Sequence, residues 1–378
     1  MTNDNRTNKT SLTKIDDAQE ILRHHLECLW ADPAKAVDLP PIMMWGPPGI
    51  GKSTIIRELT EELDIGFIDV RLAQREPVDI RGLPVPRDDR QGVDWIIASE
   101  WPREGQEDFK PRGIILFDEI TAADPSLQVA AYELILDRRL GTLYDVPDGW
   151  YIVAAGNRTK DGAVARAMSS ALANRFCHLE LTEDHKSWVD WGWKNGIHPS
   201  VLAFIRFRPD LLLNMAGNRE RGWPSPRTWA RVSLEMQLAE TTGLSNRALS
   251  HIIEGLVGVG AAIEFQGFRN WADKLPDIEG ILRGDEKVVI PERSDQRYAL
   301  ISALVTHILE EPDIGVIING IFDVLLAFTN DWCQVAYHDI QLTLTARGRL
   351  ADLTLLSTHP LHEELEERLL GAIPDSED

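Results

Sequence analysis

One nine-residue segment constrains this chain more than any other: Gly46-Pro-Pro-Gly-Ile-Gly-Lys-Ser-Thr54. It follows the short apolar run 42–45 and leads into a stretch with helical spacing, 53–63. The segment matches the pattern G-x-x-x-x-G-K-[ST], in which glycines let backbone N–H groups wrap a phosphate and the following helix adds a favourable dipole. Glycine-rich segments also occur as plain turns, but the Lys-Ser-Thr ending and the flanking strand favour a phosphate-binding loop.

Every residue of this loop is predicted to contact a nucleotide. Lys52 is expected to reach the β- and γ-phosphates, and the Ser53 hydroxyl is expected to ligate Mg²⁺. The complete predicted set is Gly46, Pro47, Pro48, Gly49, Ile50, Gly51, Lys52, Ser53 and Thr54.

Apolar runs alternate with helical segments from residue 41 to about residue 181. The runs are 41–45, 66–71, 113–117, 150–155 and 176–181. Short apolar runs separated by helices are typical of a parallel sheet that is covered on both faces. Beyond His185 the pattern changes to helices broken by Gly and Pro. We therefore predict an α/β core followed by an α-helical half, with the join near residue 184.

Composition limits the function classes. The chain has 378 residues, which favours more than one domain, and 60 Asp+Glu against 39 Lys+Arg, a net charge of −21. Such acidity argues against duplex binding through a broad basic face, although it leaves a local basic pore open. The three Cys fit a reducing compartment. A polar N-terminus and the lack of a long apolar stretch predict a cytoplasmic protein without membrane insertion.

The predicted third strand, Gly113-Ile-Ile-Leu-Phe-Asp-Glu119, ends in two adjacent carboxylates. Asp118 is expected to hold Mg²⁺ through its water shell, as a Walker B aspartate does. Glu119 can polarise a water for attack on the γ-phosphate. Strand ends often expose acids without a function, but the upstream phosphate loop makes that alternative weak. A small-molecule kinase needs no water-activating glutamate, so the pair favours an NTP hydrolase.

Three further residues are candidates for catalysis. Asn157 ends the fourth apolar run, in the crevice where open α/β sheets bind ligands, although an Asn also suits a plain turn there. Arg175 precedes the fifth run and can act as an arginine finger on a developing phosphate charge; a surface salt bridge is its alternative. Arg227 follows Pro226 at a probable helix start and is uninformative by itself.

Five elements in order, GPPGIGKST, IILFDEI, IVAAGN, LANRF and SPR, resemble the AAA+ ATPases, and specifically the MoxR-like branch. The resemblance covers roughly residues 38–240 and implies a five-stranded parallel sheet between helices, followed by a small helical lid. It also implies that Asn157 is the sensor-1 residue and that Arg227 is a sensor-2 arginine reaching the nucleotide from the lid. Arg175 would then be donated to a neighbouring subunit, so the site is complete only in a homo-oligomeric ring, usually a hexamer.

On this basis we expect a flexible tail (1–14), an AAA+ nucleotide-binding core (15–184), a helical lid (185–270) and a helical C-terminal region of unknown role (271–378). The stretch 74–102 resembles a pore-facing insert. The stretch 139–150 resembles the hairpin before sensor 1, with Pro147-Asp148-Gly149 as its turn. Many relatives have Asn where this chain has Thr121, and Trp45 replaces a common aliphatic residue. Neither departure is expected to touch the chemistry.

Together these features predict an enzyme that hydrolyses ATP with Mg²⁺ in a ring and remodels or activates a protein partner. The resemblance suggests a von Willebrand factor A domain protein as that partner. A nucleic-acid-dependent motor, such as a helicase-loader-like subunit, is the alternative, and the acidic charge counts against it. A scaffold that binds ATP without turnover is disfavoured because Glu119 and Arg175 are both present.

Overall fold

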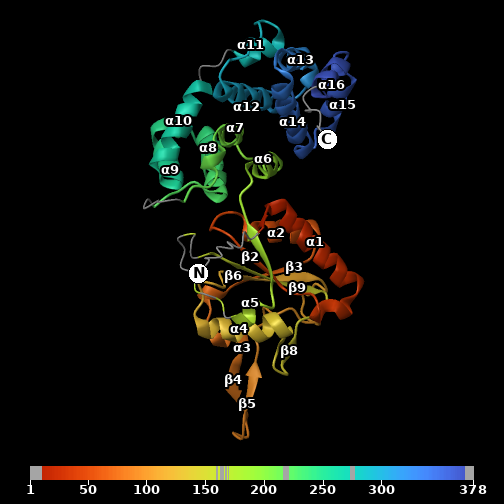
Figure 1. The fold of residues 1–378 in the computed structure, drawn as a ribbon, viewed down its shortest axis with the longest axis vertical. Helices are drawn as coiled ribbons and strands as arrows, with labels where there is room; N and C mark the ends of the chain where they lie inside the picture. Colours follow the sequence, from red (N-terminus) through yellow and green to blue (C-terminus); the bar gives the residue numbers. More distant parts are fainter. Residues whose placement is uncertain are drawn as a thin grey trace, which may run out of the picture. The chain divides into compact units, whose positions relative to one another are not determined.

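The computed structural model describes residues 11–158, 161, 166, 168, 170–215, 221–272 and 277–370 (Figure 1). The chain divides into two compact units, Met1–Asp184 and His185–Asp378. The first contains a parallel sheet with helices on its faces and is called the α/β unit. The second is built from helices and is called the helical unit. An α/β fold with a helical C-terminal half was predicted, and this prediction is confirmed.

The sheet has six strands in the order β1-β10-β2-β9-β6-β3, and every neighbouring pair is parallel. The strands are β1 (Leu12–Thr13), β2 (Ile42–Trp45), β3 (Gly66–Arg71), β6 (Gly113–Asp118), β9 (Trp150–Gly156) and β10 (Cys177–Leu181). Five of them coincide with the five predicted apolar runs. The exception is β1, which lies in the segment that we expected to be a flexible tail. That expectation is wrong for Leu12 and Thr13, which pair with Glu180 and Leu181.

Successive residues of a strand face opposite sides of the sheet, so each strand supplies two cores. In β2, Ile42 and Met44 pack under α1 (Ile15–Ala31) and α2 (Lys52–Glu62). Met43 points to the other side, where α4 (Pro125–Asp137) covers the sheet together with the short helices α3 (Pro77–Arg81) and α5 (Ser170–Ala173). Figure 1 shows the two layers of helices on either side of the strands.

Two antiparallel hairpins extend from the α/β unit. One is formed by β4 (Leu83–Pro86) and β5 (Val93–Ile96), and it projects beyond α3 and α4 (Figure 1). The other is formed by β7 (Arg139–Leu140) and β8 (Tyr144–Asp145). A hairpin was predicted here, but with the wrong turn. Its loop contains Gly141, at φ 54°, whereas Pro147 accepts a hydrogen bond from the Trp150 N–H in a separate turn that leads into β9.

The helical unit contains eleven α-helices within its described residues. They are α6 (His185–Lys194), α7 (Pro199–Phe207), α8 (Pro226–Thr242), α9 (Asn246–Val257), α10 (Val259–Ala272), α11 (Ile278–Arg283), α12 (Ser294–Glu310), α13 (Ile318–Ala327), α14 (Asn330–Ala346), α15 (Leu350–Thr358) and α16 (His362–Leu370). The sequence predicts helices broken by Gly and Pro in this half, and two such breaks are present. Gly258, at φ 80°, separates α9 from α10, and Pro312 lies between α12 and α13.

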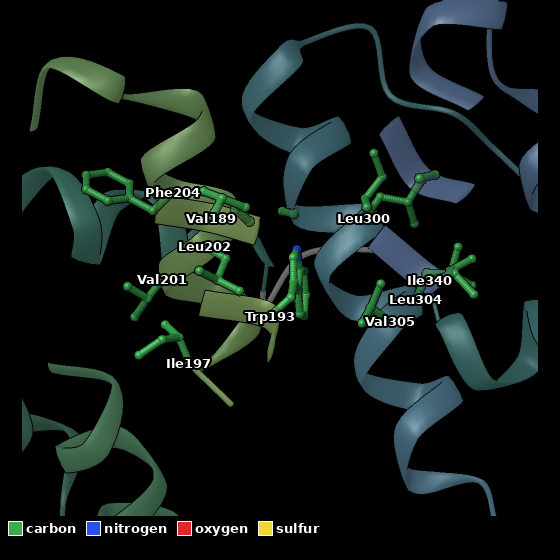
Figure 2. Packing of buried hydrophobic residues seen from close by; sticks show 14 of the residues in the cluster. Val189, Trp193, Ile197, Val201, Leu202, Phe204, Leu300, Leu304, Val305 and Ile340 are labelled. Atoms are coloured by element: carbon green, nitrogen blue, oxygen red, sulfur yellow. The ribbon is translucent and has the colours of Figure 1, made fainter. Parts of the chain in front are cut away.

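One hydrophobic cluster runs through the whole helical unit, from Val189 to Leu365. Figure 2 shows part of this cluster, including Trp193 of α6, Leu202 of α7 and Leu304 of α12. The segments that we expected to be a lid and a C-terminal region therefore share a core. Among the described residues, no helix is both long and apolar enough to cross a membrane.

A buried ion pair also joins these two segments. Arg206 of α7 donates a hydrogen bond to Asp339 of α14, whose side chain is 3% exposed. Burial raises the pKa of Asp339, and the Arg206 guanidinium acts against that rise. The pair holds α7 to α14, because an ionised carboxylate that is buried is stable only beside a partner of opposite charge.

Candidate nucleotide-binding site

The phosphate-binding loop joins β2 to α2, where the sequence predicted it. Gly49 and Gly51 lie in the left-handed region, at φ 84° and 113°, which favours glycine. A Cβ on Gly51 would meet nothing within 4 Å, so its backbone conformation rather than lack of space favours glycine there. The loop ends at the N-terminus of α2, whose dipole and free N–H groups favour an anion.

Lys52 is held inside this loop with only 8% of its surface exposed. Its Nζ donates hydrogen bonds to the carbonyl oxygens of Gly46 and Pro47, at 2.7 and 3.1 Å, and to Asn157 Oδ1 at 2.9 Å. These three acceptors carry no formal charge. A phosphate oxygen would add attraction between opposite formal charges to such a hydrogen bond.

The two predicted Mg²⁺ ligands are in contact with each other. Ser53 Oγ donates a 2.6 Å hydrogen bond to Asp118 Oδ2, and Asp118 Oδ1 accepts one from the Glu119 N–H at 2.8 Å. A hydroxyl and a carboxylate are the hard oxygen ligands that Mg²⁺ prefers, so the pair fits this ion. Within the described part of the chain, no group of three or more His, Cys, Asp or Glu could hold a metal. Magnesium would therefore need phosphate and water oxygens as its remaining ligands.

The chain turns away from the direction of β6 at Glu119, whose backbone is left-handed, with φ at 55°. This conformation is uncommon for a residue with a side chain and is often found at functional sites. The turn is held by two backbone hydrogen bonds: the Ala122 N–H donates to the Glu119 carbonyl, and the Ile120 N–H donates to the Ala155 carbonyl. The sheet thus presents Glu119 at its carboxyl edge, next to Asp118.

Asn157 lies at the same edge, directly after β9, where its Oδ1 contacts Lys52. Its backbone is bound by Thr121. Thr121 Oγ1 accepts a hydrogen bond from the Asn157 N–H at 3.1 Å and donates one to the Asn157 carbonyl at 3.2 Å. We expected that Thr121 would not touch the residues that carry the chemistry. That expectation is wrong, because Thr121 contacts the backbone of Asn157 directly.

Other residues at this edge were not predicted. Arg158 donates hydrogen bonds to Asp161 and Glu180. Burial acts to lower the pKa of Arg158, but the two carboxylates outweigh burial and raise that pKa.

Asp69 of β3 has a raised pKa, first because of burial and then because of the nearby Asp118. A charged residue inside an otherwise apolar run was the indication in the sequence that could have identified Asp69.

A side-chain link connects the base of the loop to the segment that carries Arg175. Trp45 Nε1 donates a 2.8 Å hydrogen bond to His178 Nδ1. Because Nδ1 accepts, the proton of a neutral imidazole is on Nε2, which lies 2.7 Å from the Ala173 carbonyl oxygen. Ala173 is two residues before Arg175. Trp45, which we expected to have no bearing on the chemistry, is therefore coupled to the predicted finger segment.

Arg175 does not belong to the cluster around Lys52. It is exposed and lies just before the amino end of β10, where Cys177 is level with Ile42, whereas the loop begins after the carboxyl end of β2. Four residues of parallel strand separate these levels by about 13 Å. Arg175 instead lines a cavity of about 210 Å³ with Pro41 and Tyr151. In its own chain, Arg175 is at the opposite edge of the sheet from the phosphate loop.

Arg227 is exposed on the first turn of α8, in the helical unit. The predicted helix start is confirmed. Ser225 is the N-cap residue and forms a capping box with Thr228, and Pro226 occupies the first helical position. The role of Arg227 toward a nucleotide stays a prediction.

Comparison with known proteins supports the nature of this site. Residues 41–176 match the family model of the AAA domain, dynein-related subfamily. The matched range contains the phosphate loop, Asp118, Glu119, Asn157 and Arg175. Residues 41–176 are therefore an AAA domain of the AAA+ ATPase class.

Solved structures are more distantly similar. A protein of Cytophaga hutchinsonii proposed to be an ATPase is 12% identical, with a TM-score of 0.33, over 64% of this chain and 84% of that chain. The Thermotoga maritima RuvB Holliday junction branch migration motor is 15% identical, with a TM-score of 0.34, over 83% and 89%. NtrX from Brucella abortus in complex with ADP is 18% identical, with a TM-score of 0.35, over 90% and 67%. Likenesses this weak carry no argument about function.

Proposed function

We propose that this chain is a MoxR-like AAA+ ATPase that binds MgATP and hydrolyses it in a ring assembly to remodel or activate a protein partner. The observation that carries the proposal is a pair of contacts at the carboxyl edge of the sheet: Lys52 is hydrogen-bonded to Asn157, and Ser53 is hydrogen-bonded to Asp118. Glu119 is next to them, on a strand end bent away from the sheet.

In this mechanism the loop N–H groups and Lys52 bind the phosphates of ATP. Ser53 and Asp118 would hold Mg²⁺, which would neutralise phosphate charge. Glu119 orients a water and accepts its proton, and Asn157 helps to position that water. These residues come from the ends of two neighbouring strands, β6 and β9, and from the loop after β2, so the sheet itself determines their spacing.

The arginine finger is supplied by the neighbouring subunit. The distance of Arg175 from its own phosphate loop supports this, because within one chain the guanidinium is at the wrong edge of the sheet. A finger contributes about 10³–10⁵ in rate, so the isolated chain should be nearly inactive. We propose a homo-oligomeric ring, a hexamer by analogy with the MoxR-like branch, with Arg227 completing the site from the helical unit.

We propose that the ring acts in the cytoplasm on a protein that bears a von Willebrand factor A domain. The net charge of −21 supports a protein rather than nucleic acid as the substrate, since a nucleic-acid motor gains affinity from Lys and Arg. The alternative, a nucleic-acid-dependent motor, predicts that single-stranded DNA stimulates hydrolysis with a steep salt dependence.

The test is the steady-state ATPase rate against protein concentration for the wild type, Glu119→Gln and Arg175→Ala. We expect a rate per subunit that rises steeply with concentration and collapses in both variants. Arg23→Ala is the matched control, since Arg23 is on α1 and pairs with Glu62 away from the loop. A rate that is independent of concentration, with Arg175→Ala unaffected, would contradict the shared site.

A further inference from the structure

We propose that Thr121 is a positioning residue that fixes Asn157 relative to Glu119 and Lys52. The inference rests on the proposed function, because it concerns the same hydrolytic site. It gives a role to a residue outside the phosphate loop, the acidic pair and the arginines. It also explains how two separate strand ends are kept in register at the point where they meet the substrate.

Thr121 forms two hydrogen bonds with the backbone of Asn157, and this pair of bonds is called the clasp. A hydroxyl has one donor and two acceptor lone pairs, so Thr121 Oγ1 can bind the Asn157 N–H and the Asn157 carbonyl at the same time. Thr121 is 1% exposed, so water does not compete for these bonds. The clasp fixes the Asn157 backbone, which leaves its side chain free to bind Lys52 through Oδ1.

Close packing holds the clasp in place. A Cβ on Gly156, the last residue of β9, would lie 2.7 Å from Thr121 Cγ2 and 2.9 Å from Thr121 Oγ1. The threonine side chain therefore lies directly against the strand end. The Thr121 carbonyl also accepts a hydrogen bond from the Arg166 N–H at 2.8 Å, so the backbone of Thr121 is fixed as well.

Thr121 is two residues after Glu119, and the left-handed backbone of Glu119 sets the direction of that short segment. One rigid segment thus carries both the carboxylate that orients water and the hydroxyl that holds Asn157. If the hydroxyl is removed, Asn157 and Glu119 are no longer fixed relative to each other. Binding of ATP depends mainly on the loop and Lys52, so the loss falls on turnover rather than on affinity.

The central experiment compares Thr121→Val, which keeps the side-chain shape, with Thr121→Ser, which keeps the hydroxyl. We expect Thr121→Val to lower kcat about 10- to 100-fold, since a misplacement of about 1 Å can reduce rates by 10². The KM for ATP should change less than about threefold, as for an interaction used in turnover. Thr121→Ser should retain most of the wild-type kcat.

The matched control is Thr60→Val. Thr60 is also buried, at 2% exposure, and its hydroxyl donates only a local bond to the Arg57 carbonyl within α2. Thr60→Val therefore also replaces a buried hydroxyl by a methyl group in the α/β unit, and it does not touch Asn157. We expect Thr60→Val to turn over ATP at the wild-type rate. Equal loss of kcat in Thr60→Val and Thr121→Val would overturn the inference, because the effect would then be general to buried threonines.

Asn157→Ala separates failure of this inference from failure of the proposed function. If Asn157→Ala hydrolyses ATP at the wild-type rate, the catalytic role of Asn157 is wrong, and the clasp has nothing to position. If Asn157→Ala is slow but Thr121→Val is normal, only the inference about Thr121 fails. We expect the double variant Thr121→Val/Asn157→Ala to be no slower than Asn157→Ala alone. Fully additive losses would contradict the inference. Thr121→Ala replaces Thr121→Val in this cycle if the valine variant does not fold.

Discussion

Lys52 of the α/β unit is buried and Arg206 of the helical unit is partly buried, and these two basic side chains are held in different ways. Lys52, in the α/β unit, donates to two backbone carbonyls and an amide oxygen. Arg206, in the helical unit, is paired with the carboxylate of Asp339. Lys52 lies within the phosphate loop, where a bound phosphate would contact it, whereas Arg206 is paired with a carboxylate inside the helical core. The comparison therefore sets a cation at a candidate ligand site against a cation in the core of the fold.

The largest expected effect comes from breaking the ion pair. Arg206→Met leaves Asp339 buried without its partner, and we expect the free energy of unfolding of the helical unit to fall by about 3–5 kcal/mol. Urea unfolding measures the change. Arg208→Met is the control, since Arg208 pairs with the exposed side chains of Asp210 and Glu264 and such surface pairs contribute about 0–1 kcal/mol each. A loss below that of the control would show that the pair does not hold α7 to α14.

The same variant should depend on pH in a defined direction. Burial raises the pKa of Asp339, and removing Arg206 takes away the main influence that lowers it. The folded state then binds a proton more tightly than the unfolded state, so stability falls as pH rises from the ordinary Asp pKa through the raised folded value. Arg206→Met should regain stability at pH 5 relative to pH 7.5 in urea unfolding. Arg206→Met/Asp339→Asn should not, and equal behaviour of the two would contradict the assignment to Asp339.

Replacing Lys52 should affect function more than the fold. We expect Lys52→Ala to lower the ATPase rate by about 10²–10³, equivalent to about 2.7–4 kcal/mol of transition-state stabilisation. Its free energy of unfolding should fall less than that of Arg206→Met, by about 1–3 kcal/mol, because the carbonyls of the buried residues Gly46 and Pro47 lose a donor. Lys110→Ala, at an exposed pair with Asp64, should change neither quantity. Severe unfolding of Lys52→Ala would make the two cations equivalent and remove the contrast.

A smaller effect is expected from a glycine at a strand end of the α/β unit. Gly156→Ala places a Cβ against Thr121 and Met43, at 2.7 and 2.8 Å. We expect it to destabilise the α/β unit by about 1–3 kcal/mol, as overpacking of a core does, and to slow ATP hydrolysis by displacing the Thr121 clasp. Thermal unfolding together with the ATPase rate would test both effects. A stable and fully active Gly156→Ala would contradict the close packing at this strand end.

The smallest expected effect is a gain rather than a loss of stability. Gly267 is within α10, where a Cβ would meet nothing within 4 Å. Gly267→Ala should stabilise the helical unit by about 0.5–1 kcal/mol, because alanine is the better helix former. Urea unfolding measures this gain as well. A loss of stability would mean that this helix face is covered in the folded protein.

The features predicted from the sequence were those that neighbouring residues determine. The phosphate loop is a contiguous motif, and five strands appeared as contiguous apolar runs. The strand at Leu12 escaped detection because two residues are too few for a periodic pattern and its pairing with β10 is distant in sequence. The role of Thr121 was missed for the same reason: its partner, Asn157, is 36 residues away, and no local pattern reports that contact. The turn at Pro147 was recognised but was assigned to the wrong pair of strands.

The positions of the phosphate loop and Arg175 have a consequence for symmetry. The phosphate loop and Arg175 lie at opposite edges of the sheet, so a subunit can receive an arginine through one face and offer its own through another. A contact of this kind is heterologous, and its repetition gives a ring where the rotation closes and an open row where it does not. An open row always leaves one loop without an arginine and one arginine without a loop. Among such head-to-tail assemblies, the closed ring gives every subunit the same complete site.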